Sequence, residues 1–256
     1  MMKLTFLGTG TSCGVPTIGC RCPVCTSTNP KDKRLRCSLL VETEKTCVLV
    51  DCGPDFRQQI LSQPFRRIDG VLVTHAHYDH IGGIDDLRPF ACFGDVDIYA
   101  DRHASDSLHQ MLPYCFAKSK YPNVPEILLH TIEPHCKLEI GDVSVVPIEV
   151  MHGKLPILGY RFERFAYITD MKTIADSELQ YLQDLDLLIV NALRVEKPHH
   201  SHQLVPDAVD FSNKISPKRT LLIHSSHHIG CHDDVCKMLP VGIEMAYDGQ
   251  EIFIWC

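Results

Sequence analysis

The sequence lacks a long apolar run and lacks an excess of positive charge. None of its apolar segments approaches the roughly 20 residues that a membrane-spanning helix needs. Its 25 Lys and Arg residues are outnumbered by 32 Asp and Glu residues, which gives a formal net charge of −7. A broad cationic surface is therefore not expected, and nucleic acid is a poor candidate partner. The opening residues, MMKLTFLGTG, hold too short an apolar segment for a signal peptide, so we expect a cytoplasmic protein with no membrane partner.

Repeats, low-complexity runs and obvious linkers are also missing. Apolar segments predict strands at 3–8, 37–42, 46–51, 69–75, 96–100, 143–152, 157–163, 165–170, 186–192 and 219–225. Helices are predicted at 54–63, 82–90, 101–112, 177–185, 205–215 and 232–240. We expect a loop over 113–136 and a closing hairpin formed by 243–248 and 251–256. One α/β domain, residues 1–256, with two sheets is the simplest architecture for this pattern.

Histidine and cysteine, in contrast, are abundant, with 15 and 13 residues. The histidines gather in three groups along the chain, within residues 75–80, 199–202 and 224–232. Disulfides are a poor explanation for so many thiols in a reducing compartment. Clusters of this composition favour metal binding.

The segment VTHAHYDHIGG, residues 73–83, carries the strongest chemical signal. His75 and His77 are two residues apart at the end of a predicted strand, so their side chains can face one metal. Asp79 and His80 follow as the chain turns into a helix, and they indicate a second metal beside the first. Imidazole and carboxylate ligands together suit Zn, Mn or Fe. The competing interpretation is a histidine-rich surface turn.

This HxHxDH pattern resembles that of the metallo-β-lactamase superfamily, which implies a four-layer αβ/βα sandwich. Further residues that match the superfamily pattern follow other predicted strands, where loops gather to form a site; they are Asp51 in LVDCGPD, His152 in VMHGK, Asp170 in YITDM and His224 in LLIHSSH. By this resemblance, one metal would be held by His75, His77, His152 and Asp170. The other would be held by Asp79, His80, Asp170 and His224, with Asp170 bridging the two. Asp51 matches a position that orients the ligands.

Three cysteines, Cys20, Cys22 and Cys25, lie within GCRCPVC near the start of the chain. Together with LLIHSSHHIGCHDDVCKMLP near the end, this region is similar to the PhnP-type branch, whose members are cyclic phosphodiesterases. The resemblance implies that the cysteines hold a structural zinc with His227 as fourth ligand. Other candidates for that fourth ligand are Cys13, Cys231 and His232. A redox role for the CxxC pair, or thiols with no role, are weaker interpretations.

The segment KPHHSHQL, residues 197–204, resembles a family segment whose last histidine meets the phosphoryl group. That histidine corresponds to His202. His200 stands where the family commonly has proline, so His199 or His200 could serve in place of His202. The alternative is a polar loop on the surface.

We therefore expect a metal-dependent phosphodiesterase that hydrolyses a small cyclic phosphodiester to a phosphomonoester through a hydroxide held by two metals. Its cofactors would be two divalent metals (Zn, Mn or Fe) and one structural zinc. Asp79 and His202 are the candidate catalytic residues, His202 as a proton donor or a partner of the phosphoryl oxygens. A ribose cyclic phosphate, a cyclic nucleotide and a small linear diester are all compatible substrates, and a homodimer is compatible with the sequence.

Three other functions compete with this interpretation. A nuclease or tRNA 3′-processing enzyme is disfavoured by the acidic balance. A thioesterase, lactonase or β-lactamase is disfavoured by the bridging Asp170 together with His202. A non-catalytic zinc protein, such as a pyrroloquinoline quinone accessory-type protein, is disfavoured by the complete ligand set.

Overall fold

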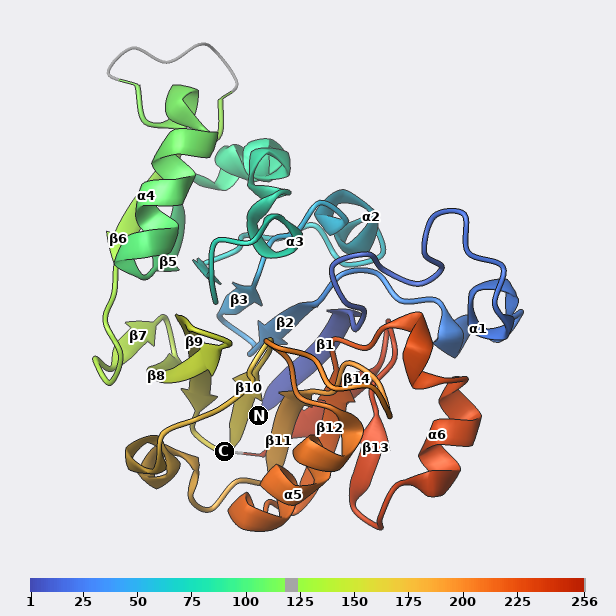
Figure 1. Ribbon diagram of the computed structural model, residues 1–256. Helices are drawn as coiled ribbons and strands as arrows, with labels where there is room; N and C mark the ends of the chain where they lie inside the picture. The colour runs from blue at the N-terminus through green and yellow to red at the C-terminus, as the bar shows by residue number, and fades with distance from the viewer. Residues whose placement is uncertain (118–123, 256) are drawn as a thin grey trace.

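The computed structural model describes residues 1–117 and 124–255, and its strands form two seven-stranded sheets (Figure 1). The first sheet contains, in spatial order, β14 (Glu251–Ile254), β1 (Met2–Gly8), β2 (Ser38–Glu42), β3 (Cys47–Val50), β4 (Gly70–Leu72), β5 (Val96–Ala100) and β6 (Ile127–Thr131). The second contains β13 (Ile243–Met245), β12 (Arg219–Ile223), β11 (Leu187–Asn191), β10 (Phe165–Ile168), β9 (Leu155–Phe162), β8 (Val143–His152) and β7 (Leu138–Ile140). In each sheet, one half is parallel and the other half is antiparallel.

Helices cover the outer face of each sheet (Figure 1). The first sheet carries α2 (Phe56–Ile60), α3 (Tyr78–Ile81), the 3₁₀ segment η2 (Ile84–Phe93) and α4 (Arg102–Met111). The second carries the 3₁₀ segment η4 (Asp176–Leu182), α5 (Val205–Ile215) and α6 (His232–Met238). Short turns complete the described chain: α1 (Pro23–Thr26), η1 (Pro30–Asp32), η3 (Pro113–Cys115) and η5 (His227–Ile229). The expected four-layer αβ/βα sandwich is confirmed.

The strands are apolar on both faces because each sheet borders two cores. In β2, Leu39 and Val41 belong to the core between the sheets, whereas Leu40 belongs to the core under the helices of the first sheet. Successive strand side chains point to opposite faces, so a strand in this position must be apolar throughout. This explains why the sequence shows continuous apolar segments rather than an alternating pattern.

The prediction of a loop over 113–136 is wrong for part of this range. Residues Ile127–Thr131 form β6, which pairs in parallel with β5 at the edge of the first sheet. Most of its side chains are exposed or half-buried, since an edge strand with a partly solvated face needs few apolar residues. The remainder of the prediction includes residues 118–123, which lie outside the described residues.

The predicted closing hairpin is also wrong. β13 pairs in parallel with β12 in the second sheet, whereas β14 pairs antiparallel with β1 in the first sheet. The five residues between β13 and β14 therefore cross from one sheet to the other instead of forming a hairpin turn. Residue 256, the last in the predicted hairpin, lies outside the described residues.

Several predicted helices are shorter or tighter in the structure than in the prediction. α2 spans Phe56–Ile60 within the predicted 54–63, and the predictions at 82–90 and 177–185 correspond to the 3₁₀ segments η2 and η4. Pro89 lies inside η2, where it has no N–H to donate to a regular helix.

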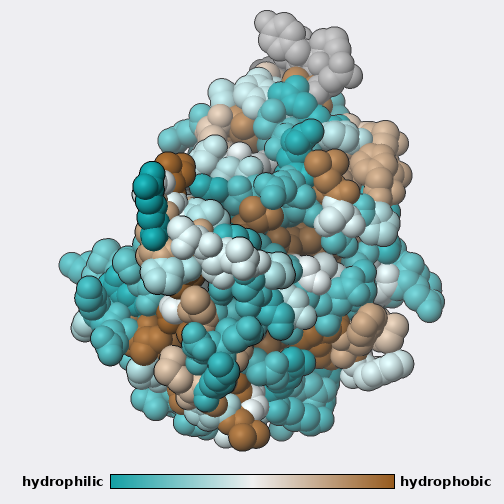
Figure 2. Space-filling view, turned by 90° about the vertical axis from the view of Figure 1, so that its right-hand side faces the viewer, coloured by the Kyte–Doolittle hydropathy of each residue, from teal (hydrophilic) through white to brown (hydrophobic). Residues whose placement is uncertain are grey.

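The face on the right of Figure 1 is mostly hydrophilic, with hydrophobic residues in separate patches (Figure 2). In the part of the chain that the structure describes, no helix combines the length and apolarity that crossing a membrane requires.

The hydroxyl of Tyr160 makes a buried hydrogen bond that ties the two sheets together. Tyr160 on β9 donates to the carbonyl oxygen of Val73, just after β4, at 2.6 Å. We expect Tyr160→Phe to lower the free energy of unfolding by about 1–3 kcal/mol, because the carbonyl is left buried without its donor. Urea unfolding measures the change. Tyr99→Phe, which alters a half-buried ring packed on the same core, is the matched control, and an equal loss in both variants would contradict the prediction.

Candidate metal centres

Candidate ligands, and Asp51 that was expected to orient them, lie where strands of both sheets end. Asp51 follows β3, Asp170 follows β10 and His224 follows β12. All three have left-handed backbone conformations, with φ of 60°, 55° and 55°. Few non-glycine residues adopt this conformation, although it also occurs in this chain at His135, Asp184, Lys197 and Ser216, which lie outside the clusters.

His75, His77 and His152 form the first cluster, with one ligand atom of each within 4.8 Å of the others. The Nδ1 of His152 lies 2.7 Å from the carbonyl oxygen of Asp170, which can only accept. Nδ1 therefore carries the proton, and Nε2 keeps a lone pair. The Nε2 of His75 lies 2.9 Å from Nδ1 of His77, so a cation shared by the two rings would satisfy both.

Asp79, His80 and His224 form the second cluster, again with ligand atoms within 4.8 Å of one another. The Nδ1 of His80 donates to Asp51 at 2.7 Å, while its Nε2 lies 3.2 Å from Asp79 and 3.3 Å from Asp170. The Nε2 of His80 and both ring nitrogens of His224 are buried without a hydrogen-bond partner. Buried polar atoms in this condition are rare, and a divalent metal among these donors would satisfy them.

Asp170 joins the two clusters. Its carboxylate lies 3.3 Å from Nε2 of His80 and 3.1 Å from Nε2 of His224, and it also groups with His75 and His80 as a set that could hold one ion. Burial alone would raise the pKa of Asp170, but the imidazoles, His224 foremost, hold it well below its usual range. The carboxylate is therefore ionised and could bind a metal ion on either side.

Asp51 does not face the clusters directly but orients them. It accepts hydrogen bonds from His80 Nδ1 and, at 2.8 Å, from the backbone N–H of Thr74. The Thr74 hydroxyl donates to Asp51 and lies 3.0 Å from Nδ1 of His75, from which it accepts. Sequence reasoning missed Thr74, although its place directly before the HxH pair was visible.

Asn191 is a second residue that sequence reasoning missed. Its side chain accepts from the backbone N–H of Met171 at 2.8 Å and donates to the carbonyl oxygen of Met171 at 3.0 Å. These two bonds fix the chain immediately after Asp170. Asn191 is the last residue of β11, and the sequence of that strand does not indicate which backbone groups its side chain contacts.

Of the three histidines proposed for the catalytic position, His202 is the one placed at Asp170. Its Nε2 lies 3.0 Å from the carboxylate, and it groups with His152 and Asp170. Burial lowers the pKa of His202 to about 4. His200 instead lines an open pocket of about 560 Å³ at the mouth of the first cluster, whose other lining residues are His77, His152, Gly153, Lys154, Leu155 and Ser201.

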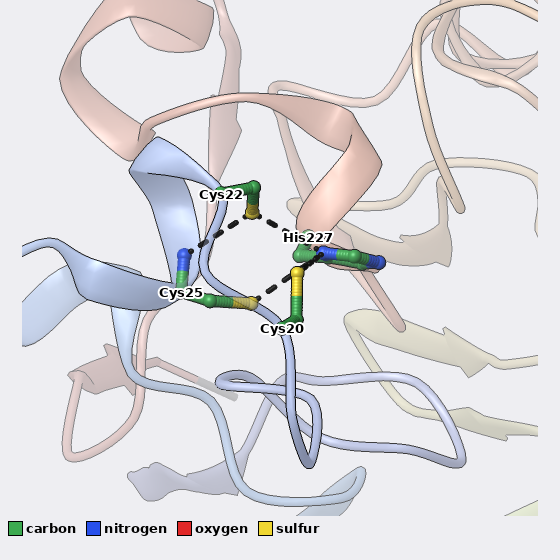
Figure 3. Close-up of side chains that lie close together, drawn as sticks. All are labelled: Cys20, Cys22, Cys25 and His227. Carbon is green, nitrogen blue, oxygen red and sulfur yellow. Dashed lines mark hydrogen bonds between the residues drawn. The ribbon is translucent and has the colours of Figure 1, made fainter.

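The three N-terminal cysteines meet His227 in a separate cluster (Figure 3). The Nδ1 of His227 lies 3.2 Å from the sulfur of Cys20, 3.3 Å from that of Cys22 and 3.4 Å from that of Cys25. The Cys22 sulfur accepts from the backbone N–H of Cys25, which is the first cause that lowers the pKa of Cys22 to about 6. A thiolate at neutral pH is the form that binds zinc.

The other candidates for the fourth ligand are not part of this set of ligand atoms. Cys13 is exposed, and the Nδ1 of His232 lies 3.3 Å from the guanidinium of Arg34. Cys231 packs beside the three cysteines but is not part of the set whose ligand atoms lie within 4.8 Å of one another. The geometry therefore favours His227, and its role as a zinc ligand stays a prediction.

Comparison with known proteins gives two kinds of relative. The family model of the beta-lactamase superfamily domain matches residues 46–225. A crystal structure described as a new diphosphatase from the PhnP family superposes with a TM-score of 0.91 and 38% sequence identity, covering 98% of this chain and 96% of that one.

Curated relatives carry other names. The octanoyltransferase of Porphyromonas gingivalis is 43% identical over 254 residues, which is 99% of this chain and 52% of that protein. A ribonuclease Z of Thermosynechococcus vestitus is 28% identical over 162 residues, which is 62% of this chain and 36% of that protein. This chain therefore spans about half of the first relative and about a third of the second.

We expect His227→Ala and Cys22→Ser to lose one tightly bound zinc, and His224→Ala to retain it. His224 and His227 are three residues apart but belong to different clusters. Loss of the zinc should also destabilise the fold, because structural metal binding contributes to folding. Metal analysis after dialysis, with unfolding curves, measures both effects. Cys231→Ser is the matched control, and loss of zinc from that variant with retention in His227→Ala would make Cys231 the fourth ligand.

Proposed function

The chain belongs to the metallo-β-lactamase superfamily as a PhnP-type member, and from that premise we propose that it hydrolyses a small cyclic phosphodiester to a phosphomonoester. The observation that carries the proposal is Asp170, which two ligand clusters share and which His202 contacts at 3.0 Å. Two cationic sites joined by one carboxylate suit a substrate whose reacting group is an anion.

The ligand roles follow the clusters. His75, His77 and His152 would hold one divalent metal, Asp79, His80 and His224 the other, and Asp170 both. When bound, such metals lower the pKa of a water molecule and stabilise the charge that develops on phosphoryl oxygens. Zn, Mn and Fe all suit these ligands, and the cysteine cluster would hold a structural zinc.

His202 is the residue that we propose meets the substrate. Its ring is neutral at neutral pH before a substrate binds, since burial holds its pKa near 4. An anionic phosphodiester beside it would raise that pKa. His202 then donates a hydrogen bond to a phosphoryl oxygen, or a proton to the leaving alkoxide. Asp79 assists by keeping a negative charge beside His80 and His224.

A second candidate is hydrolysis of a diphosphate, because the PhnP-family relative is described as a diphosphatase. In both reactions, water attacks a phosphorus atom. The leaving group is an alkoxide in the first reaction and a phosphate in the second. A phosphate leaving group needs no proton, so it depends less on His202.

The remaining functions are weaker. The name octanoyltransferase describes a protein of which this chain matches 52%, and the clusters here have the composition of metal sites rather than of an acyl-carrying nucleophile. The sequence match to the ribonuclease Z of Thermosynechococcus vestitus covers 62% of this chain, and the net charge of −7 disfavours nucleic acid. A non-catalytic role of the pyrroloquinoline quinone accessory type would not require the complete set of candidate ligands in the two clusters. Thioesters and lactones do not require a second cationic site.

The sequence pattern and composition support a single domain over residues 1–256, a cytoplasmic location, and a partner other than membrane or nucleic acid. The small phosphodiester as partner rests on the family, and a homodimer is compatible with the sequence.

We expect Mn²⁺- or Zn²⁺-loaded protein to convert a ribose cyclic phosphate or a 2′,3′-cyclic nucleotide to a phosphomonoester. ³¹P NMR measures this conversion. Asp170→Asn should lose nearly all turnover, because one neutral amide replaces the carboxylate that both clusters share. A dinucleoside diphosphate and an alkyl thioester belong in the same assay. Turnover of the diphosphate alone would favour the second candidate, and turnover of the thioester alone would contradict both.

We expect His202→Ala to slow hydrolysis of diesters with alkyl leaving groups by about 10²–10⁴-fold, the usual contribution of a positioned acid. Bis(p-nitrophenyl) phosphate should show a much smaller loss, since nitrophenolate leaves without a proton. Metal content should not change. His103→Ala, on the exposed side of α4, is the control. Equal losses on both substrates would mean that His202 does not act on the leaving group.

A further inference from the structure

The side chain of His199 lies directly behind His202. Its Nδ1 is 3.0 Å from Nδ1 of His202, 3.3 Å from the hydroxyl of Ser201 and 3.4 Å from the backbone nitrogen of Ser201. A backbone N–H can only donate, so Nδ1 of His199 is an acceptor in this arrangement. The nitrogen of His202 that faces it is then the donor.

The imidazole of His202, which is neutral when no substrate is bound, therefore carries its proton on Nδ1 and keeps a lone pair on Nε2. One nitrogen faces His199 and the Ser201 hydroxyl, at 3.0 Å and 3.1 Å, and the other faces Asp170 at 3.0 Å. Turning the ring over about its Cβ–Cγ bond would place a C–H group beside His199 and would lose the hydrogen bond at Nδ1. That hydrogen bond therefore selects one orientation of the ring and presents Nε2 to the site.

Ser201 connects this arrangement to the first ligand cluster. Its carbonyl oxygen lies 3.0 Å from Nδ1 of His152, which donates to it, and Ser201 is buried. Gly153, which follows His152, has φ of 65°, and a Cβ there would lie 3.3 Å from Cβ of Ser201. The segment from His199 to His202 therefore packs against the β8–β9 turn, which gives it a fixed base.

We propose that His199 is a positioning residue, which fixes the orientation and tautomer of His202 through the contact between their Nδ1 atoms. The described hydrogen bonds and ring contacts of His199 are with His200, Ser201 and His202, so we expect it to act through His202 and not on the substrate. The role in turnover rests on the proposed function, whereas the effect on the ring of His202 does not.

Two substitutions separate this role from simple packing. His199→Leu keeps most of the side-chain volume and removes the acceptor, whereas His199→Asn keeps an acceptor oxygen close to the place of Nδ1. For alkyl diesters we expect His199→Leu to lower kcat by about 10–100-fold, the usual cost of removing a partner that orients a catalytic or ligand side chain. KM and metal content should stay within about twofold of the parent, and His199→Asn should recover much of the loss.

A double variant tests whether His199 acts through His202. If it does, His199→Leu combined with His202→Ala should be no slower than His202→Ala alone, because residues that act as a unit are not additive. Multiplied losses in the double variant would overturn the proposal. His103→Leu, an exposed histidine on α4, is the matched control.

Long-range ¹H–¹⁵N spectra of the imidazole rings provide a readout without substrate. The parent should show one tautomer for His202, and His199→Leu should show a mixture or the other tautomer. An unchanged His202 spectrum in His199→Leu would overturn the inference, whatever the activity. A parent that hydrolyses no phosphodiester but shows the spectral change would overturn the proposed function and leave the positioning role intact.

Discussion

The carboxylate of Asp170 sets the main constraint on this structure. It is buried, and a buried charge is costly unless donors or cations surround it. Its partners come from three distant segments: His80 from α3, His202 from the loop before α5, and His224 from the end of β12. These contacts require the two sheets to end their central strands at the same edge, and both ligand clusters follow from that requirement.

The cysteine cluster supports this edge from outside. It attaches the N-terminal loop to His227, three residues beyond His224, and two backbone bonds reinforce the attachment: Thr11 N–H to Ser225 at 3.2 Å, and Ser225 N–H to Thr9 at 3.1 Å. The backbone beside His224 is therefore held on both sides, while the ring of His224 has no protein hydrogen bond of its own. A zinc ion in the cysteine cluster would thus support the backbone beside a candidate ligand of the second cluster.

Residue type and spacing predicted the ligands in the HxHxDH segment, whereas His152, Asp170 and His224 were predicted by resemblance to a known family. The HxHxDH segment and its position after β4 needed no structure. The strand pairings did need one: Leu4 pairs with Ile252 across almost the whole chain, and nothing local distinguishes that pairing from a hairpin. The contacts of Thr74 and His199 were equally hidden, since a hydrogen bond between side chains depends on angles that a pattern of residue types does not encode.

The left-handed backbone at Asp51, Asp170 and His224 bears on how far the fold could be improved as a scaffold. Each such conformation costs a non-glycine residue on the order of 1–2 kcal/mol. Glycine at these three positions would remove that strain, but at Asp51 it would also leave the Nδ1–H of His80 and the backbone N–H of Thr74 buried without an acceptor. The strain at these positions is therefore not a simple target for stabilisation. A variant with a higher free energy of unfolding that keeps these residues needs its stabilising substitutions elsewhere, for example along the exposed edge strand β6.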